Sequence, residues 1–189
     1  DGSVHKDLPF VNLARKSASS FTLEQSGTYR IDVVQAPIDV TWFKNEKGEY
    51  DRIFGPHEAA AKGIPAKATD IEKWRIFNNI QTYVTRNDIT QKALKATGHG
   101  LELGFGTHPS ALFINEKYQF SLTLNGKAVG ENIGVKITRH NTRFRNKRNS
   151  LEPTTDAKGA FEVSFDKAGL YLIEAELQVP SKDGPISTM

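Results

Sequence analysis

The chain has 189 residues, of which 38% are hydrophobic and 25% charged, and its formal net charge is +3 at pH 7. This balance is ordinary for a globular protein and excludes intrinsic disorder of the whole chain. The small positive excess does not support nucleic-acid binding. There is no cysteine, which excludes disulfides and cysteine-ligated zinc or iron–sulfur sites. No apolar run reaches the roughly 18 residues of a membrane span, and the start at Asp1, without initiator methionine or signal peptide, is expected of a processed or trimmed chain.

The first half of the chain predicts strands followed by an insertion. Three segments alternate apolar with polar side chains, as expected for a sheet with one face in water: residues 19–24, 28–34 and 38–43. Residues 56–73 are rich in alanine and lysine and predict a short helical or irregular insertion, with a helical patch at 57–62. Residues 74–85 include β-branched and aromatic side chains and predict a strand. The expected linker is 86–100.

The second half gives a clearer pattern of short strands. The strand candidates are residues 101–105, 118–124, 133–139, 160–165 and 170–177. Asn125 and Gly126 form a turn signal that favours positive φ, and residues 155–159 form another, in which Asp156 is expected to bond to its own backbone. Strands at this spacing without a long helix indicate a sandwich.

One motif occurs twice: a strand, a polar turn with glycine, and a strand that begins with a tyrosine. The two tyrosines are Tyr29 and Tyr171. In immunoglobulin-like sandwiches such a tyrosine bonds through its hydroxyl to the backbone a few residues upstream. The predicted fold class is therefore all-β, with two immunoglobulin-like β-sandwich domains in tandem at residues 1–97 and 98–189. Counting strands around each copy predicts that the first domain lacks its first strands and the second lacks its last strand.

Short motifs along nearly the whole chain occur in the order seen in one protein family. They are Asp1-Gly2-Ser3, Gly27-Thr28-Tyr29-Arg30, Trp42-Phe43-Lys44, Tyr83-Val84-Thr85, residues 97–103, Thr107-His108-Pro109, residues 155–159 and residues 168–175. In this respect the chain resembles a bacterial periplasmic family of unknown function once described as the periplasmic component of a cobalt/nickel transport system (NikM-like).

The resemblance implies an exported, periplasmic protein with two sandwiches and an association with metal or siderophore uptake. Members of that family usually begin with a histidine-containing segment and continue into a final strand after the loop that corresponds to residues 180–189. Neither feature is seen in this sequence, in agreement with the strand count.

Three residues are the candidate ligands of a transition-metal ion: His99, Glu102 and His108, around the strand expected at 101–105. Imidazole and carboxylate suit nickel, cobalt, zinc or copper. Nine residues of extended strand would separate the histidines by about 30 Å, so the pair shares an ion only if the intervening loop folds back. The alternative is that His99 lies in a linker and His108 caps a turn before Pro109.

A basic run is the candidate surface for an anion or an acidic partner, with Arg139, Arg143, Arg145, Lys147 and Arg148 and no acidic residue. The alternative is a solvated hairpin in which Phe144 packs inward while Arg143 and Arg145 share the opposite face.

No catalytic motif is present: the sequence has no nucleophile elbow, phosphate-binding loop or metalloprotease helix. Trp42 and Trp74 are expected in the core or on a sheet face rather than as sugar platforms. These observations predict a non-enzymatic periplasmic binding or accessory protein of metal uptake, with an envelope transport component or another protein as partner. The alternative is a protein- or glycan-interaction module without metal binding. A hydrolase would need a pocket with convergent polar groups.

Overall fold

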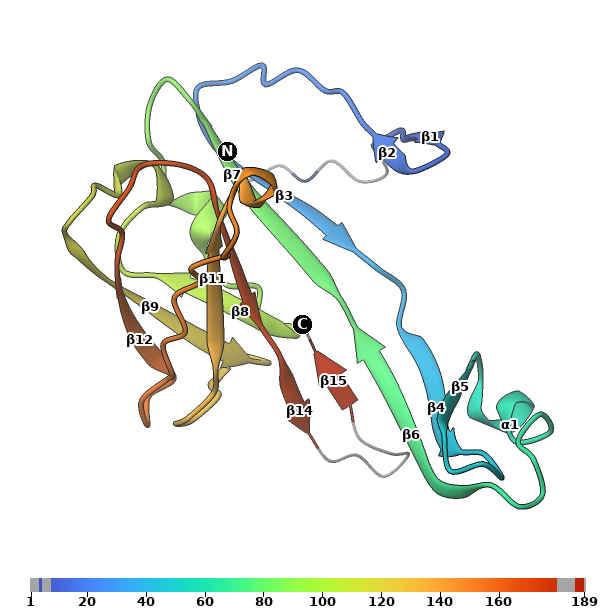
Figure 1. The fold of residues 1–189 in the computed structure, drawn as a ribbon. Helices are drawn as coiled ribbons and strands as arrows, with labels where there is room; N and C mark the ends of the chain where they lie inside the picture. The colour runs from blue at the N-terminus through green and yellow to red at the C-terminus, as the bar shows by residue number, and fades with distance from the viewer. Residues whose placement is uncertain (1–3, 5–7, 180–185, 189) are drawn as a thin grey trace.

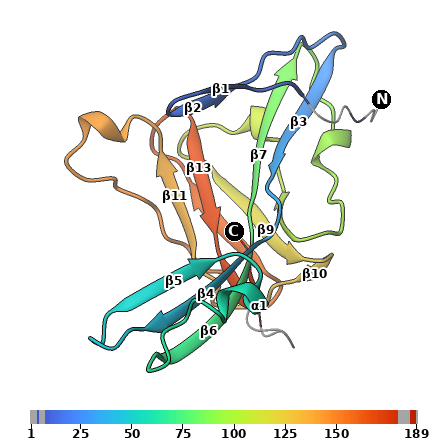
Figure 2. The same ribbon diagram turned by 90° about the vertical axis from the view of Figure 1, so that its right-hand side faces the viewer.

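The computed structural model describes residues 4, 8–179 and 186–188 and shows a mostly β protein with a body and a projecting arm (Figure 1). The body is built from strands of the second half of the chain. The arm is built mainly from the first half and extends away from the body, as the turned view also shows (Figure 2).

The body consists of two sheets that enclose the main hydrophobic core. One sheet contains β8 (Leu101–Phe105), β9 (Lys117–Leu124), β10 (Lys127–Ala128) and β12 (Ala160–Ser164). The other contains β11 (Val135–Arg139) and β13 (Tyr171–Ala175). The strands expected near 101–105, 118–124, 133–139, 160–165 and 170–177 are therefore confirmed, with small differences at their ends.

Alternation along these strands fills the core, because successive side chains point to opposite faces of a sheet. The buried set is Tyr118, Phe120, Leu122, Val135, Ile137, Phe161, Val163 and Phe165. The rings of Phe120 and Phe161 stack with centroids 5.5 Å apart. Burying a side chain of this size contributes roughly 1.5–3 kcal/mol, so this cluster is the main source of the body's stability.

The two predicted turns are confirmed in the body. Asn125 and Gly126 have φ of 51° and 75°, which suits the tight hairpin between β9 and β10. Asp156 accepts backbone hydrogen bonds from Lys158 (2.8 Å) and Ala160 (2.9 Å) through Oδ1, so it is a turn residue as expected.

The arm continues from a two-stranded ribbon. In the ribbon, β3 (Gly27–Val34) pairs antiparallel with β7 (Asn79–Arg86). Both strands of the ribbon connect to a second sheet: β3 is followed by β4 (Ile38–Lys44), and β7 is preceded by β6 (Thr69–Phe77). In this sheet β4 lies between β5 (Tyr50–Phe54) and β6. This sheet is completed by β15 (Ile186–Thr188), parallel to β6, and by β14 (Leu177–Val179) at its edge.

Short elements complete the described chain. They are the hairpin β1 (Val11–Leu13) and β2 (Lys16–Ala18), the helix α1 (His57–Ala60), and the 3-10 turns η1 (Lys92–Leu94), η2 (Pro109–Ala111) and η3 (Thr142–Phe144). The helical patch within the expected insertion is confirmed as α1, but residues 69–73 already belong to β6.

The strand expected at residues 19–24 is wrong, because this segment forms no strand. The guanidinium of Arg86 instead donates to the carbonyls of Leu23 and, at 2.6 Å, Glu24. Those carbonyl groups are therefore satisfied by a side chain rather than by a sheet ladder.

The repeated tyrosine motif is confirmed at the level of its hydrogen bonds. The Tyr29 hydroxyl donates to the Gln25 carbonyl at 2.9 Å, and the Tyr171 hydroxyl donates to the Lys167 carbonyl at 2.6 Å. Both acceptors lie four residues upstream, as in a tyrosine corner. The two tandem immunoglobulin-like domains are not confirmed, since Tyr29 lies in the two-stranded ribbon β3–β7.

Replacing Tyr171 by phenylalanine removes only the hydroxyl that donates to Lys167. We expect Tyr171→Phe to lower the free energy of unfolding by about 1 kcal/mol, the typical net contribution of one hydrogen bond. Chemical denaturation measures this difference. Tyr50→Phe is the control, because the Tyr50 side chain is 67% exposed and its effect should stay within about 0.5 kcal/mol. A loss no greater than that of the control would contradict the prediction.

Candidate functional site

The arm exposes an aromatic and cationic surface on one face of its sheet. Paired residues of neighbouring strands share a face, and Trp42 pairs with Arg52 while Val40 pairs with both Phe54 and Trp74. Tyr50 joins the same face through its pairing with Lys44. We call this surface the Trp42 face; its members are Trp42, Tyr50, Arg52, Phe54 and Trp74.

Arg52 lies between Tyr50 and Phe54 on the edge strand β5 and contacts two aromatic rings. Its guanidinium is 4.9 Å from the centroid of Trp42 and 5.3 Å from that of Phe54. A guanidinium is attracted to the negative face of an aromatic ring, and these distances are within the range of that attraction. The contacts hold the Arg52 side chain beside the two rings while leaving it exposed.

The edges of the Trp42 face are fixed by polar contacts. The indole Nε1 of Trp74 donates to Glu72 at 3.1 Å. Lys44 forms an ion pair with Asp70 at 2.8 Å and lies 5.0 Å from the ring of Tyr50. The ion pair is the main cause of the raised pKa of Lys44, so this lysine is a cation at the rim.

The opposite face of the same sheet is buried along β4. There α1 covers Thr41 and Phe43, which are 0% and 3% exposed, and the His57 Nδ1 lies 3.1 Å from the Thr41 hydroxyl. Arg75 donates two hydrogen bonds to Asp39, at 2.6 and 3.0 Å, and these hold the pKa of that carboxyl below its ordinary value. On the Trp42 face Val40 is 0% exposed, whereas Tyr50 and Phe54 of the edge strand β5 are 67% and 61% exposed and stay open to solvent.

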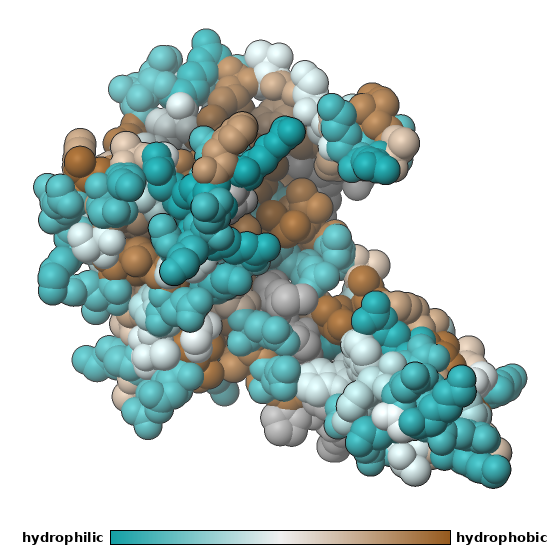
Figure 3. All heavy atoms as spheres, in the orientation of Figure 1, coloured by the Kyte–Doolittle hydropathy of each residue, from teal (hydrophilic) through white to brown (hydrophobic). Residues whose placement is uncertain are grey.

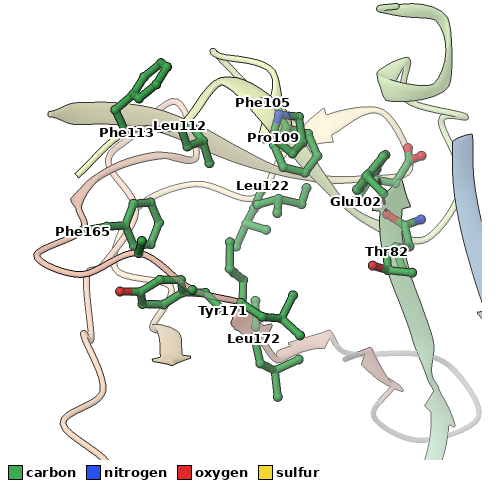
Figure 4. A pocket seen from close by; sticks show the side chains of 18 of the residues that line it. Thr82, Glu102, Phe105, Pro109, Leu112, Phe113, Leu122, Phe165, Tyr171 and Leu172 are labelled. Carbon is green, nitrogen blue, oxygen red and sulfur yellow. Dashed lines mark hydrogen bonds between the residues drawn. The ribbon is translucent and has the colours of Figure 1, made fainter. Parts of the chain in front are cut away.

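Glu102, a predicted metal ligand, is engaged by the backbone of the preceding loop. Its side chain is almost fully buried on β8 and accepts three hydrogen bonds: from the Thr97 backbone at 2.6 Å, the Thr97 hydroxyl at 2.8 Å and the Gly98 backbone at 2.8 Å. Burial raises the pKa of Glu102, but these hydrogen bonds outweigh it and lower the pKa. The carboxylate, which also lines a cavity of the body (Figure 4), fixes the linker to β8.

His108, the second predicted ligand, is a buried joint between body and ribbon. Its Nδ1 accepts from the backbone N–H of Ser110 at 3.0 Å and thereby caps η2, while Nε2 lies 2.9 Å from the Thr28 hydroxyl. Since Nδ1 is an acceptor, the neutral ring carries its proton on Nε2, which donates to Thr28. Both ring nitrogens are thus occupied, and the expectation that His108 caps the turn before Pro109 is confirmed.

The structure does not bring the three predicted ligands together. His99, the third, is an exposed residue of the linker. Within residues 4, 8–179 and 186–188, no group of three or more histidine, aspartate or glutamate side chains could hold a metal ion. Glu102 and His108 each serve local structure instead.

The basic run does not form the expected hairpin with an inward Phe144. Residues 142–144 form the 3-10 turn η3, so the alternation of a strand does not apply, and Phe144 is 84% exposed. Arg139 donates to the Ala168 carbonyl at 3.1 Å, and Arg145 donates to the carbonyls of Arg139 and His140. Only part of the run is left facing solvent, namely Arg143, Lys147 and Arg148.

The sequence reasoning missed most of the Trp42 face. It placed Trp42 and Trp74 in the core or on a sheet face, and both are half-buried on the sheet. It did not predict β5, although residues 50–54 alternate large side chains in the order tyrosine, arginine, phenylalanine with Asp51 and Ile53 between them. That alternation could have predicted the strand β5. The pairing of Arg52 with Trp42, by contrast, became known only from the structure.

Replacing Glu102 by glutamine tests its role in holding the linker. Because the folded state lowers the pKa of Glu102, its stabilising contribution is complete above the pKa of the unfolded chain and is lost as the pH falls through the folded pKa. We expect Glu102→Gln to cost about 1–3 kcal/mol at neutral pH and to weaken the acid dependence of stability. Denaturation at several pH values measures both. Equal slopes below pH 5 for variant and wild type would contradict the assignment.

No helix in the described part of the chain is both long and apolar enough to cross a membrane.

Comparison with known proteins places the chain in a family. Residues 3–179 match the family model described as Domain of unknown function (DUF4198). No curated protein and no solved structure matches the chain significantly. The family match does not confirm the cobalt/nickel transport component that the sequence resemblance named. Because the match covers most of the sequence, the chain belongs to the DUF4198 domain family.

Proposed function

We propose that this chain is a non-enzymatic binding protein of the bacterial cell envelope that docks a protein partner on the Trp42 face. The single observation that carries the proposal is Arg52, exposed and held between the rings of Trp42 and Phe54. Tryptophan, tyrosine and arginine are the residues in which binding energy concentrates at protein interfaces.

The position of the Trp42 face on the arm supports docking. The arm projects from the body (Figure 1), and α1 lies on the other face of its sheet, so a partner reaches the Trp42 face without displacing any described segment. The aromatic rings supply apolar area at low entropic cost, because they have few rotatable bonds. The Arg52 contacts hold its side chain in place before binding, which reduces the cost of ordering it.

Replacing Trp42 or Arg52 by alanine should weaken the binding of the partner to the Trp42 face. We expect Trp42→Ala and Arg52→Ala to lose at least about tenfold in affinity, since a central interface residue contributes about 2 kcal/mol or more. Affinity capture from an envelope extract of the producing cells, followed by titration of the captured protein, measures the loss. Arg143→Ala removes an exposed arginine elsewhere and is the matched control.

Equal capture by wild type, Trp42→Ala and Arg52→Ala would contradict the proposal. If a glycan bound instead, and Trp42→Ala weakened that binding, the proposed ligand would be a sugar rather than a protein. Circular dichroism of each variant separates loss of docking from loss of folding.

The envelope setting and the link to metal uptake belong to the proposal through the sequence resemblance. Here the protein acts as a periplasmic accessory of a nickel, cobalt or iron uptake system. Calorimetric titration with Ni²⁺, Co²⁺, Fe³⁺, Zn²⁺ and Cu²⁺ tests direct metal binding, and an ion bound more tightly than millimolar would support that form of the proposal. Failure of all five would remove the metal-binding form and leave docking on the Trp42 face untouched.

We also infer that the body is the immunoglobulin-like sandwich expected at residues 98–189. The tyrosine corner at Tyr171 and the pairing of its strand β13 with β11 support this assignment. In that fold the strand that bears the tyrosine has neighbours on both sides, whereas β13 pairs only with β11 among the described strands.

A further inference from the structure

A cavity of about 600 Å³ lies between the body and the ribbon. One wall is β7, the opposite wall is β13, and side chains of β8 and β9 form the floor. In Figure 4, Leu122, Phe165 and Tyr171 surround the cavity on the side of the body, and Thr82 lies on the strand across from them. We call this cavity the slot.

On the side of the slot, the backbone of β13 has no strand partner among the described residues. Ile137 of β11 exchanges both backbone hydrogen bonds with Leu151, so its N–H and C=O point away from β13. Ile173 lies opposite Ile137, and in an antiparallel pair such a residue also turns its N–H and C=O outward. By the period of two, the backbone groups of Tyr171 and Ala175 point the same way.

The backbone of β7 presents a matching row from the other wall. Gln35 donates to the Asn78 carbonyl at 3.2 Å, which makes this pair a hydrogen-bonded one in the ladder of β3 with β7. Hydrogen-bonded and non-hydrogen-bonded pairs alternate. The N–H and C=O of Asn79, Gln81 and Tyr83 therefore point away from β3 and toward the slot, and these residues line it.

The short strand β15 shows how a further strand would lie between these two rows. Thr188 pairs with Leu177 on one side and with Phe77 on the other. A strand that continued two positions beyond Thr188 in the same registers would face Ala175 on the antiparallel side and Asn79 on the parallel side. The next alternate positions then face Ile173 with Gln81, and Tyr171 with Tyr83.

Each of these three positions of the added strand thus faces one residue of β13 and one of β7. These are the six residues whose backbone groups point into the slot. The agreement comes from two independent pairings of β15 and from the separate hydrogen-bond patterns of β11 and β3. The slot is therefore strand-shaped in both register and hydrogen bonding. The slot also lies in line with β15, which separates β14 from β6. These two strands are the neighbours in sequence of β13 and β7, which form the walls of the slot.

We propose that the slot binds an extended strand of a partner polypeptide, which runs antiparallel to β13 and parallel to β7. Strand addition of this kind takes its affinity from main-chain hydrogen bonds and its specificity from pockets for alternate side chains. The bound strand joins β11 and β13 to β7 and β3 in one continuous sheet.

The side chains of the slot define the sequence that the strand needs. Tyr171 and Ile173 pack against the body's core, so strand positions opposite them also face inward, toward Leu103 and Phe105 of the floor. Those positions require apolar side chains. The positions between them face outward and accept polar residues. The buried Oδ1 of Asn79, which has no hydrogen-bond partner within the part of the chain that the structure describes, offers an acceptor at one end of the slot.

The test uses the whole chain and a fluorescein-labelled peptide of about seven residues with valine at alternate positions and threonine or lysine between. We expect saturable fluorescence anisotropy with this peptide. A peptide of the same composition with its valines placed consecutively should bind more weakly. Equal binding of the two peptides, or no binding of the alternating one, would overturn the proposal.

Gln81→Pro probes the hydrogen bonds of the slot. Proline removes the Gln81 N–H that points into the slot and leaves the bonds between β3 and β7 in place. We expect peptide affinity to fall about tenfold, as loss of one hydrogen bond to the strand predicts. Ile80→Thr is the control on the same strand, because the Ile80 side chain is 56% exposed on the outer face. Unchanged affinity in a folded Gln81→Pro variant would overturn the proposal.

Hydrogen exchange on the wild-type chain keeps the test decisive if Gln81→Pro does not fold. Bound peptide should slow exchange of the Tyr171, Ile173, Ala175 and Gln81 amides, and no slowing would overturn the proposal. A second experiment uses a variant in which the same seven residues are appended after the C-terminus. Protection by the appended strand alone, without binding of the free peptide, would show that a partner polypeptide is the wrong source.

The inference does not rest on the Trp42 face. Arg52→Ala should leave peptide binding unchanged, and Gln81→Pro should leave docking on the Trp42 face unchanged. A result in which Arg52→Ala abolishes peptide binding would place the peptide on the arm and overturn the slot.

Discussion

The arrangement of the molecule depends on the joint between the ribbon β3–β7 and the body. His108, 5% exposed, caps a turn of the body through one ring nitrogen and contacts Thr28 of the ribbon through the other. Beside it, the rings of Tyr83 and Phe105 meet edge to face at 5.0 Å. Because the ribbon continues into the arm, this contact positions the arm together with β14, which follows β13 and joins the sheet of the arm through β15.

The body and the arm differ in how much hydrophobic surface they bury. The body holds the large hydrophobic cluster around Phe120. The arm buries few large side chains and leaves much of its surface open, and hydrophobic side chains also gather in the hollow between β1–β2 and the arm (Figure 3). Exposed aromatic faces and open strand edges are costly for a chain to keep unless they bind something. The Trp42 face and the slot are the two such surfaces for which we propose an occupant.

Local pattern predicted those parts of the fold that depend on neighbouring residues. Alternation located the strands of the body, and Asn125 with Gly126 located a hairpin, because both follow from backbone geometry within a few residues. The tyrosine hydroxyl bonds were equally local, each spanning four residues. Prediction failed at residues 19–24 and at Phe144, where a distant arginine or an irregular turn decided the conformation. Prediction grouped His99 with Glu102 and His108 as candidate metal ligands, whereas the structure leaves His99 exposed in the linker and engages the other two in local hydrogen bonds.

Sequence alone therefore determined that this protein is built from strands, where two of the turns in the body lie, and that His108 caps a turn. It could not determine what each strand pairs with, because pairing partners lie far apart in the chain and any alternating segment fits several neighbours. Tertiary structure decided that Arg52 lies beside Trp42, that β7 faces β13 across a cavity, and that Glu102 is held by the linker. Each of these depends on the register between distant segments, which no short-range pattern specifies.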